Sequence, residues 1–287
     1  MTYKTAEDVV VEAKDLFSLP DIFFQLTEMM RDPRYSLADI GNVIATDPGL
    51  SARLLRIVNS AFYGFQSKID TVSRAVTVVG ADDFYNLVVA TEVVTRFSSI
   101  PTDLIDMTSF WLRSVHCSVL AKLLAKNSGA LKIERLFLAG LLHDIGSLVL
   151  YQLMPEQAFR VLLAIQHDRR LLNGMEQEII GFTHADVGRE LLKSWGLPAS
   201  VYEVVGACNN PSAATIHKMD AWLLYLAVRL IDEKELARPI EDSLVDISDR
   251  LLGDVRLTRD QIEQAMDQSM IDFLDVFKQL LPEKHRH

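Results

Sequence analysis

Cysteine is scarce in this sequence, which has only Cys117 and Cys208 among 287 residues. The two lie far apart and form no CxxC pair, so neither a disulfide framework nor a zinc ribbon is indicated. Long apolar runs are also lacking. The most apolar segment, residues 136–150, is too short to cross a bilayer comfortably, and it contains His143 and Asp144. It therefore predicts a buried core helix and no membrane span.

Basic residues are fewer than acidic ones: the chain has 29 Lys and Arg residues and 39 Asp and Glu residues, which gives a net charge of −10. An acidic surface repels phosphate backbones, so nucleic-acid binding would need a local basic stripe, and the sequence has none. Arg169 and Arg170 form a short basic cluster, for which a solvated helix face is the favoured interpretation. We therefore expect no nucleic-acid partner.

A secretory signal is absent from the first residues, which carry acidic side chains and no continuous apolar run. A cytoplasmic location is the expectation that follows. The chain also lacks a recognisable catalytic nucleophile, a phosphate-binding loop and a nucleotide-binding motif. These absences exclude the commonest catalytic arrangements, but they leave metal-dependent chemistry open.

Helical periodicity dominates the chain, and no segment shows the alternating pattern of a strand. Local signals mark several boundaries. Ser36 is placed to cap one helix, Asp47 and Pro48 end it and begin the next, and Thr258 is placed to cap the last. The sequence therefore predicts an all-α fold.

The helical pattern changes at residues 98–103, which read SSIPTD and form the best linker candidate. Short helices precede this segment. Longer ones are predicted after it over residues 104–127 and 133–153, with later helices near 213–232 and after Pro239. The predicted division is an N-terminal helical part over 1–100, a second helical part over 101–235 and a C-terminal helical extension over 236–287.

His143 and Asp144 are the residues most suggestive of chemistry, because a carboxylate in an apolar helix must be hydrogen-bonded, ion-paired or metal-bound. His116 lies on the preceding long helix and could come beside His143, and His184 begins a later helix. Imidazole and carboxylate are the ligands expected for Mn, Fe, Ni or Zn. Taken singly, each histidine also fits an ordinary core or surface position, so a shared pocket is one of two open interpretations.

Four stretches carry a family resemblance: IATDPGLSARLLRIVNSAFYG, KIDTVSRAVTVVG, LAGLLHDIGSLVL and EIIGFTHADVGRELLKSWGLP. Together they closely resemble the HDOD domain, the HD-related output domain of bacterial signalling proteins, over about residues 12–235. The resemblance implies a multi-helical HD-superfamily fold with an N-terminal helical subdomain packed on an HD-like domain. It also implies a bacterial source and a role in signal transduction.

The same resemblance allows the metal site of HD enzymes to be checked by position. His116, His143 and Asp144 match the first histidine and the HD pair, and His184 matches a further histidine of HD-GYP relatives. Two matches fail. Cys208 and Asn209 stand where relatives often carry a histidine pair, and Val228 stands where HD enzymes place their last aspartate.

An isopropyl group at Val228 offers no lone pair to a cation, so the resemblance implies a weak or vestigial metal site. The leading hypothesis is a non-catalytic signalling module that binds a protein partner or a small ligand and uses no cofactor. The alternative is a divergent phosphohydrolase that acts on a nucleotide or cyclic dinucleotide with one divalent metal ion. A third view, compatible with the first, is a buried His–Asp hydrogen-bond network in place of the ion.

The C-terminal helix from Thr258 carries an apolar stripe through Ile262, Met266, Ile271, Leu274 and Phe277. We expect this stripe to pack on its own domain, and formation of a homodimer is the alternative.

Overall fold

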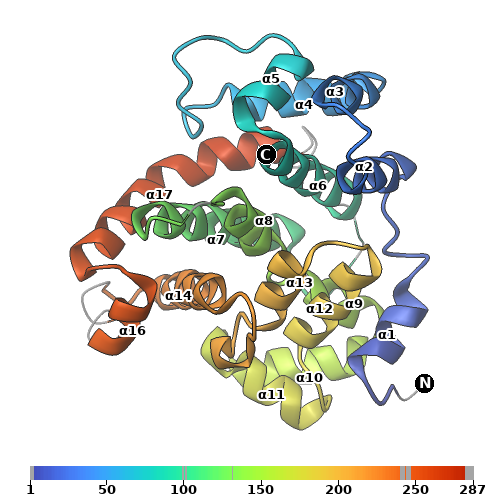
Figure 1. The fold of residues 1–287 in the computed structure, drawn as a ribbon. Coiled ribbons are helices and arrows are strands. Elements are labelled where there is room, and N and C mark those ends of the chain that lie inside the picture. The colour runs from blue at the N-terminus through green and yellow to red at the C-terminus, as the bar shows by residue number, and fades with distance from the viewer. Residues whose placement is uncertain are drawn as a thin grey trace.

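The protein is described here by a computed structural model that covers residues 3–98, 100, 102–130, 132–239, 243 and 247–281. Within these ranges the regular elements are helices and no strand occurs, which confirms the predicted all-α class (Figure 1). The helices of the first half are α1 (Ala6–Ala13), α2 (Asp21–Arg31), α3 (Leu37–Ala45), α4 (Pro48–Val58), α5 (Val72–Val79) and α6 (Ala81–Phe97).

The second half contains both long and short helices, so the longer helices predicted there occur only in part. The helices of this half are α7 (Met107–Asn127), α8 (Glu134–Leu142), α9 (Ile145–Leu153), α10 (Pro155–Ile165), α11 (Leu172–Ile179), α12 (His184–Ser194), α13 (Ala199–Gly206) and α14 (Lys218–Glu235). Two short 3₁₀ helices, η1 (Arg169–Leu171) and η2 (Pro211–Ala213), lie among them. The chain continues through α16 (Asp249–Val255) and α17 (Arg259–Leu280).

Side-chain caps account for the helix starts that the sequence predicts. The hydroxyl of Ser36 accepts a hydrogen bond from the backbone N–H of Asp39, whose carboxylate accepts one from the N–H of Ser36. Thr258 makes the same reciprocal arrangement with Gln261 at α17. Asp47 caps α4, in which proline occupies the first turn. Such caps satisfy N–H groups that have no partner inside the helix.

The helix predicted over residues 133–153 is in fact two helices, because the chain turns at His143 and Asp144 between α8 and α9. Asp144 has φ −106° and ψ 9°, outside the helical region. Side-chain partners of its carboxylate hold this turn, as described below. The helix predicted near residue 213 begins only at Lys218, after η2. The helix predicted after Pro239 falls mostly on residues 240–246, which lie largely outside the described residues, as do two positions of the predicted linker.

The segment Glu134–Leu153 is the only part of the described chain apolar and long enough by composition to cross a membrane. Its most apolar window is 89% buried inside the protein. Helices α7, α12, α13 and α14 surround it. The segment therefore lies in the buried core of the helical fold, as the sequence predicts.

Contacts between distant parts of the chain tie the two halves together. Helix α1 packs against α9 and α12 in the second half. The indole N–H of Trp195, just after α12, donates to the carbonyl oxygen of Phe17 at 2.8 Å, and its ring stacks on Phe97. The division into three parts stays a prediction, since these contacts cross its first boundary.

Helix α17 packs along α7 and reaches α4 and α6, so it also spans both halves (Figure 1). Ile262, Met266 and Phe277 of its apolar stripe are buried in this packing. Ile271 and Leu274 remain 71% and 46% exposed, so the stripe packs on its own domain only in part. The homodimer stays a prediction.

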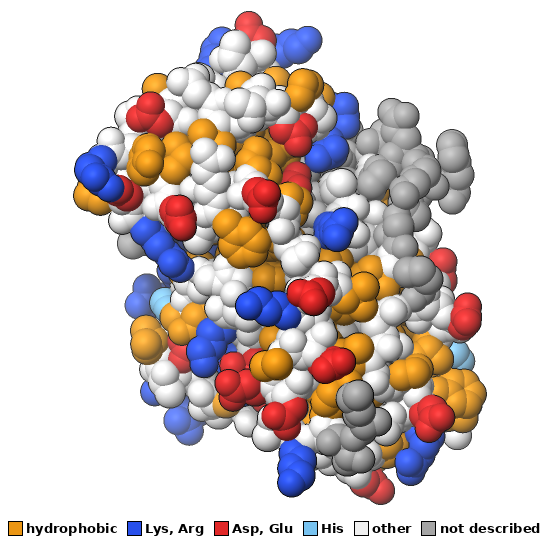
Figure 2. Space-filling view, turned by 90° about the vertical axis from the view of Figure 1, so that its right-hand side faces the viewer, with side chains coloured by type: hydrophobic (Ala, Val, Ile, Leu, Met, Phe, Trp, Pro, Cys, Tyr) orange, Lys and Arg blue, Asp and Glu red, His pale blue; other side chains and the backbone are white. Residues whose placement is uncertain are grey.

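Acidic and basic side chains alternate with apolar ones over the face that Figure 1 presents at its right-hand edge (Figure 2). No broad basic area stands out among the described residues on this face. This face therefore offers no continuous basic track for a nucleic-acid backbone.

Candidate functional site

His143 lies at the turn between α8 and α9 and is almost wholly buried. Its Nδ1 lies 2.7 Å from the carbonyl oxygen of Gly140, to which it donates a hydrogen bond. Its Nε2 is buried and has no hydrogen-bond partner among the described residues. Burial lowers the pKa of His143 to about 3, despite the opposing effect of the Asp144 carboxylate, so the ring is neutral.

The carboxylate of Asp144 is 1% exposed and has partners on both oxygens. One oxygen lies 2.5 Å from the guanidinium of Arg169, and the other accepts a hydrogen bond from the hydroxyl of Ser147. His184 Nε2 is 3.9 Å away. Burial acts to raise the pKa of Asp144, but Arg169 and then His184 outweigh it and leave the pKa below its ordinary value. The carboxylate is therefore ionised and its charge is compensated by an arginine.

The position of Arg169 contradicts the sequence prediction of a solvated helix face. Its side chain is only 18% exposed and points inward to Asp144. The chain turns at the end of α10, because Gln166 and His167, which precede Arg169 in the sequence, have positive φ of 48° and 74°. Asp168 then caps η1. Only Arg170 behaves as predicted, because it stays partly exposed and pairs with Asp168.

His184 opens α12 and uses both ring nitrogens in contacts with protein groups. Nδ1 lies 2.6 Å from the carboxylate of Glu176, and Nε2 lies 3.1 Å from the side-chain amide of Asn209. Burial alone would lower the pKa of His184, but Glu176 and further partners hold it well above its usual value. Asn209, where relatives often carry a histidine, thus contacts His184 directly.

Helix α9 reaches His184 through an unusually close approach at Gly146. A Cβ atom built on Gly146 would lie 2.0 Å from the carbonyl oxygen of His184 and 2.6 Å from the backbone nitrogen of Gly188. No side chain fits there, so glycine is required for α9 and α12 to meet. This contact sets the spacing between Asp144 and His184.

His116 lies in a different environment from the other three predicted ligands. Its Nε2 is 3.0 Å from the hydroxyl of Ser269, and its ring stacks on Phe273 with centroids 4.4 Å apart. Both partners belong to α17. Burial lowers the pKa of His116 to about 3, with Lys234 and Arg113 adding to the effect. The structure thus brings together His143, Asp144 and His184 and engages His116 with the C-terminal helix.

The pH dependence of stability is expected to report this burial of His116. An unfolded histidine takes up a proton as the pH falls through about 6.5, whereas in the fold His116 stays neutral down to about pH 3. The unfolded state binds the extra proton in this window, so His116 makes stability fall with decreasing pH, by up to about 1.4 kcal/mol per pH unit. Above pH 6.5 His116 is neutral in both states, so the stability of the fold no longer depends on pH through this residue.

Denaturant unfolding between pH 6.5 and 4.5 tests this expectation. The free energy of unfolding should fall less steeply with decreasing pH in the variant His116→Gln than in the unsubstituted protein, by up to about 1.4 kcal/mol per pH unit. His167→Gln is the matched control, because His167 is exposed on the surface. Equal slopes for all three proteins would contradict a buried, neutral His116.

Two further residues of this network are not among those that the sequence predicts. Asp232 lies one turn after Val228 on α14, and its carboxylate is 2.6 Å from Arg113 and 3.9 Å from Arg169. Arg113 also pairs with Glu235 at 3.1 Å. Since residues four apart share a helix face, the missing aspartate at 228 could have directed attention to Asp232. The arginines that hold this carboxylate have no comparable signal.

Cavities adjoin Arg169 in two directions. One, of about 360 Å³, is also lined by Asn209, Val228 and Asp232. The other, of about 580 Å³, is lined by Asp144, Tyr151 and Arg169 among others. Arg169 thus contributes to the walls of both cavities.

A divalent metal ion, which HD enzymes use, does not fit the residues as they are arranged. Of His143, Asp144 and His184, only His143 has a donor atom without a hydrogen-bond partner among the described residues, at Nε2, while both oxygens of Asp144 and both nitrogens of His184 already contact protein groups. Among the described residues, no three His, Cys, Asp or Glu side chains are grouped to hold a metal ion. A guanidinium already supplies the positive charge that a cation would bring to Asp144.

Solved structures with the same fold come from several bacteria. The chain superposes on a Shewanella amazonensis SB2B protein, provisionally named a phosphohydrolase, with TM-score 0.74 and 23% identity over 95% of this chain and 98% of that one. An HDOD domain protein of unknown function from Geobacter sulfurreducens gives 0.74 and 19% over 96% and 98%. A Marinobacter aquaeolei VT8 protein, provisionally named a signal transduction protein, gives 0.72 and 21% over 97% and 61%.

A curated protein of Treponema pallidum (strain Nichols), itself uncharacterized, is 27% identical over 211 residues, or 73% of this chain. The match spans only 40% of that protein's length. The family model of the HDOD domain matches residues 16–211. This match covers more than half of the chain, which therefore belongs to the HDOD domain family.

Proposed function

We propose that this chain is a non-catalytic regulatory module of bacterial signal transduction, which acts in the cytoplasm and binds a protein partner or a small ligand. The observation that carries the proposal is the ion pair between Arg169 and Asp144. In this arrangement the aspartate of the HD pair is neutralised by the protein itself. The site then has a structural charge network where an HD enzyme needs an open metal position.

The charges around Arg169 support a role in holding one arrangement of helices. Arg169 comes from η1, Asp144 from the α8–α9 turn and Asp232 from α14, so the network joins three separate elements. Buried ion pairs are sensitive to small displacements, because each partner is costly to leave alone. A ligand or partner that favours another position of η1 would shift the packing of these helices, which is how such a module transmits a signal.

The only support from relatives for this proposal is the provisional name of one of them. The Marinobacter protein is provisionally named for signal transduction, and the Shewanella protein for phosphohydrolysis. The second name motivates the competing function, a phosphohydrolase with one metal ion. The engaged nitrogens of His184 weigh against it, because a ligand histidine needs one nitrogen for the metal.

Hydrolysis assays separate the two functions. The purified chain is expected to release no phosphate above background from a chromogenic phosphodiester, from cyclic dinucleotides or from nucleoside monophosphates in added Mn²⁺. A metal-dependent HD phosphohydrolase that is purified by the same procedure serves as positive control. Turnover that disappears in His143→Ala while the variant stays folded would contradict the proposal.

A further inference from the structure

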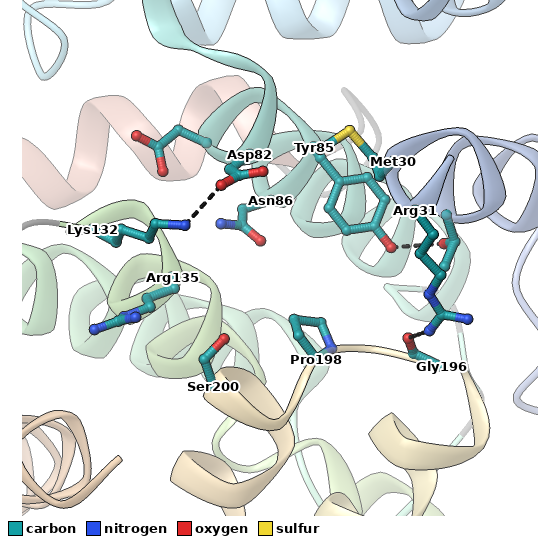
Figure 3. A pocket seen from close by; sticks show the side chains of 12 residues that line it. Met30, Arg31, Asp82, Tyr85, Asn86, Lys132, Arg135, Gly196, Pro198 and Ser200 are labelled. Carbon is teal, nitrogen blue, oxygen red and sulfur yellow. Dashed lines mark hydrogen bonds and ion pairs between the residues drawn. The ribbon is translucent and has the colours of Figure 1, made fainter. Parts of the chain in front are cut away.

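A separate cavity of about 350 Å³ lies between the two halves of the chain (Figure 3). Helices α2 and α6 of the first half line one side of it. The segment before α8 and the turn between α12 and α13 line the other side. Its volume lies at the lower end of the range of small-molecule sites. The cavity contains none of the four predicted metal ligands, so it is distinct from the site around Asp144.

Asn86 is the first sign that this cavity takes a ligand. The residue is only 8% exposed, and its side-chain amide points into the cavity from α6 (Figure 3). Among the described residues, no group hydrogen-bonds to this amide. Buried amides in folded proteins almost always have a partner. The amide therefore has both donor and acceptor capacity available to a molecule in the cavity.

Two charges of the lining are already paired within the protein. Lys132 lies 2.8 Å from Asp82, an ion pair that Figure 3 shows at one side of the cavity. Arg135 lies 2.8 Å from Asp220, which is outside the lining. These pairs shape the wall of the cavity but leave little charge for a ligand.

Asp83 and Arg31 carry the charges that remain. Asp83 makes no hydrogen bond or ion pair among the described residues, and burial, followed by Glu134 and Asp82, raises its pKa to about 6. It lies three residues before Asn86, so the two side chains share one face of α6. Arg31 donates to the carbonyl oxygen of Gly196 at 2.5 Å and has no carboxylate partner among the described residues.

The beginning of α13 adds to the positive side. Pro198 is the residue before the helix and offers no side-chain cap, so the first N–H groups of α13 have no side-chain partner. Such groups favour an anion. Figure 3 shows Arg31, Gly196 and Pro198 together at one part of the cavity and Asp82 and Lys132 at another. Arg31 thus lies at a different part of the cavity from Asp82, which is the neighbour of Asp83 in the sequence.

We propose that this cavity binds a small molecule that has N–H donors at one end and an oxyanion at the other. The donors face Asp83 and Asn86, and the oxyanion, a carboxylate or a phosphate, lies near Arg31 and the start of α13. Free amino acids and purine mononucleotides are the two sources of this chemistry. Because both halves line the cavity, the ligand bridges them and favours one arrangement of the two.

Calorimetric titration of the full chain tests the proposal with two sets of probes, the standard amino acids and the purine nucleoside monophosphates. At least one compound is expected to bind with a Kd below about 1 mM. Asn86→Leu and Asp83→Asn should each weaken that binding by about tenfold or more, which corresponds to loss of a buried hydrogen bond. Asn42→Leu, at an exposed position of α3, is the matched control and should bind as the unsubstituted protein does.

Binding in only one set of probes identifies the source of the ligand. The proposal is overturned if no compound of either set binds, or if the ligand binds Asp83→Asn as tightly as the unsubstituted chain. Asp83→Asn keeps the test decisive if Asn86→Leu does not fold. None of these results depends on metal binding or phosphate release, so this test and that of the proposed function can fail separately.

Discussion

Replacing Arg169 with methionine is expected to lower the free energy of unfolding by about 3–5 kcal/mol, the range for breaking a buried ion pair. The reason is that Asp144, at 1% exposure, keeps its negative charge but loses the guanidinium that lies 2.5 Å away. Ser147 still donates a hydrogen bond to it, but a hydroxyl carries no compensating charge. Urea unfolding at pH 7 measures the loss.

Two comparisons isolate the ion pair from the general effect of an arginine substitution. Arg170→Met removes the neighbouring, 40% exposed guanidinium. Its buried partner Glu233, 3.5 Å away, keeps Arg238 at 2.7 Å, so about 0–1 kcal/mol is expected. Asp144→Asn combined with Arg169→Met should be more stable than Arg169→Met alone, because a neutral amide replaces the unpaired carboxylate. A small effect at Arg169, equal to that at Arg170, would show that Asp144 is not held by this arginine.

Introducing a methyl group at Gly146 is expected to have a comparable effect for a steric reason. The added Cβ would lie 2.0 Å from the carbonyl oxygen of His184, a backbone atom that cannot rotate away. Helices α9 and α12 would have to separate, which disturbs the packing of Asp144 against His184. Overpacking typically costs 1–3 kcal/mol, and with backbone on the other side we expect Gly146→Ala to cost about 3 kcal/mol or more.

Gly174 in α11 is the matched control for this substitution. A Cβ there would meet no atom within 4 Å, and alanine favours the helix. Gly174→Ala should therefore raise stability by about 0.5–1 kcal/mol. If thermal melting shows Gly146→Ala to be as stable as the unsubstituted protein, the close contact between α9 and α12 does not exist in solution.

Helix starts were predictable because the interactions that determine them are local. Ser36 and Thr258 cap the helices that follow them through residues three positions away, so the pattern is visible in a short window of sequence. The break at His143 and Asp144 was not predictable in this way. The segment is uniformly apolar on both sides, and the turn depends on partners of Asp144 elsewhere in the chain.

The candidate site was predictable only in its histidines and Asp144. Arg169 is 25 residues from Asp144 in sequence. It reaches that carboxylate through left-handed turns at Gln166 and His167. Residues other than glycine rarely adopt this conformation, and tertiary packing decides where they do. A local pattern of charges around Arg169 looks like solvated surface, and the fold gives it another role.

His116 shows how little a family position says about the neighbours of a residue, and its role as a metal ligand stays a prediction. Its position in the sequence matches the first histidine of an HD site, but its side chain contacts Ser269 and Phe273 of α17. These lie more than 150 residues away in sequence, since His116 and Ser269 are 153 positions apart. No pattern around His116 could have identified partners from a C-terminal helix.

Metal content, combined with Mn²⁺ titration of the unsubstituted chain, decides whether Arg169 takes the place of a metal ion beside Asp144. We expect substoichiometric metal in the purified protein and no rise in melting temperature with Mn²⁺, since a ligand that binds only the folded state would have to raise that temperature. One tightly bound divalent ion per chain, lost in Asp144→Asn and in His184→Gln, would contradict the claim that Arg169 occupies the place of the metal.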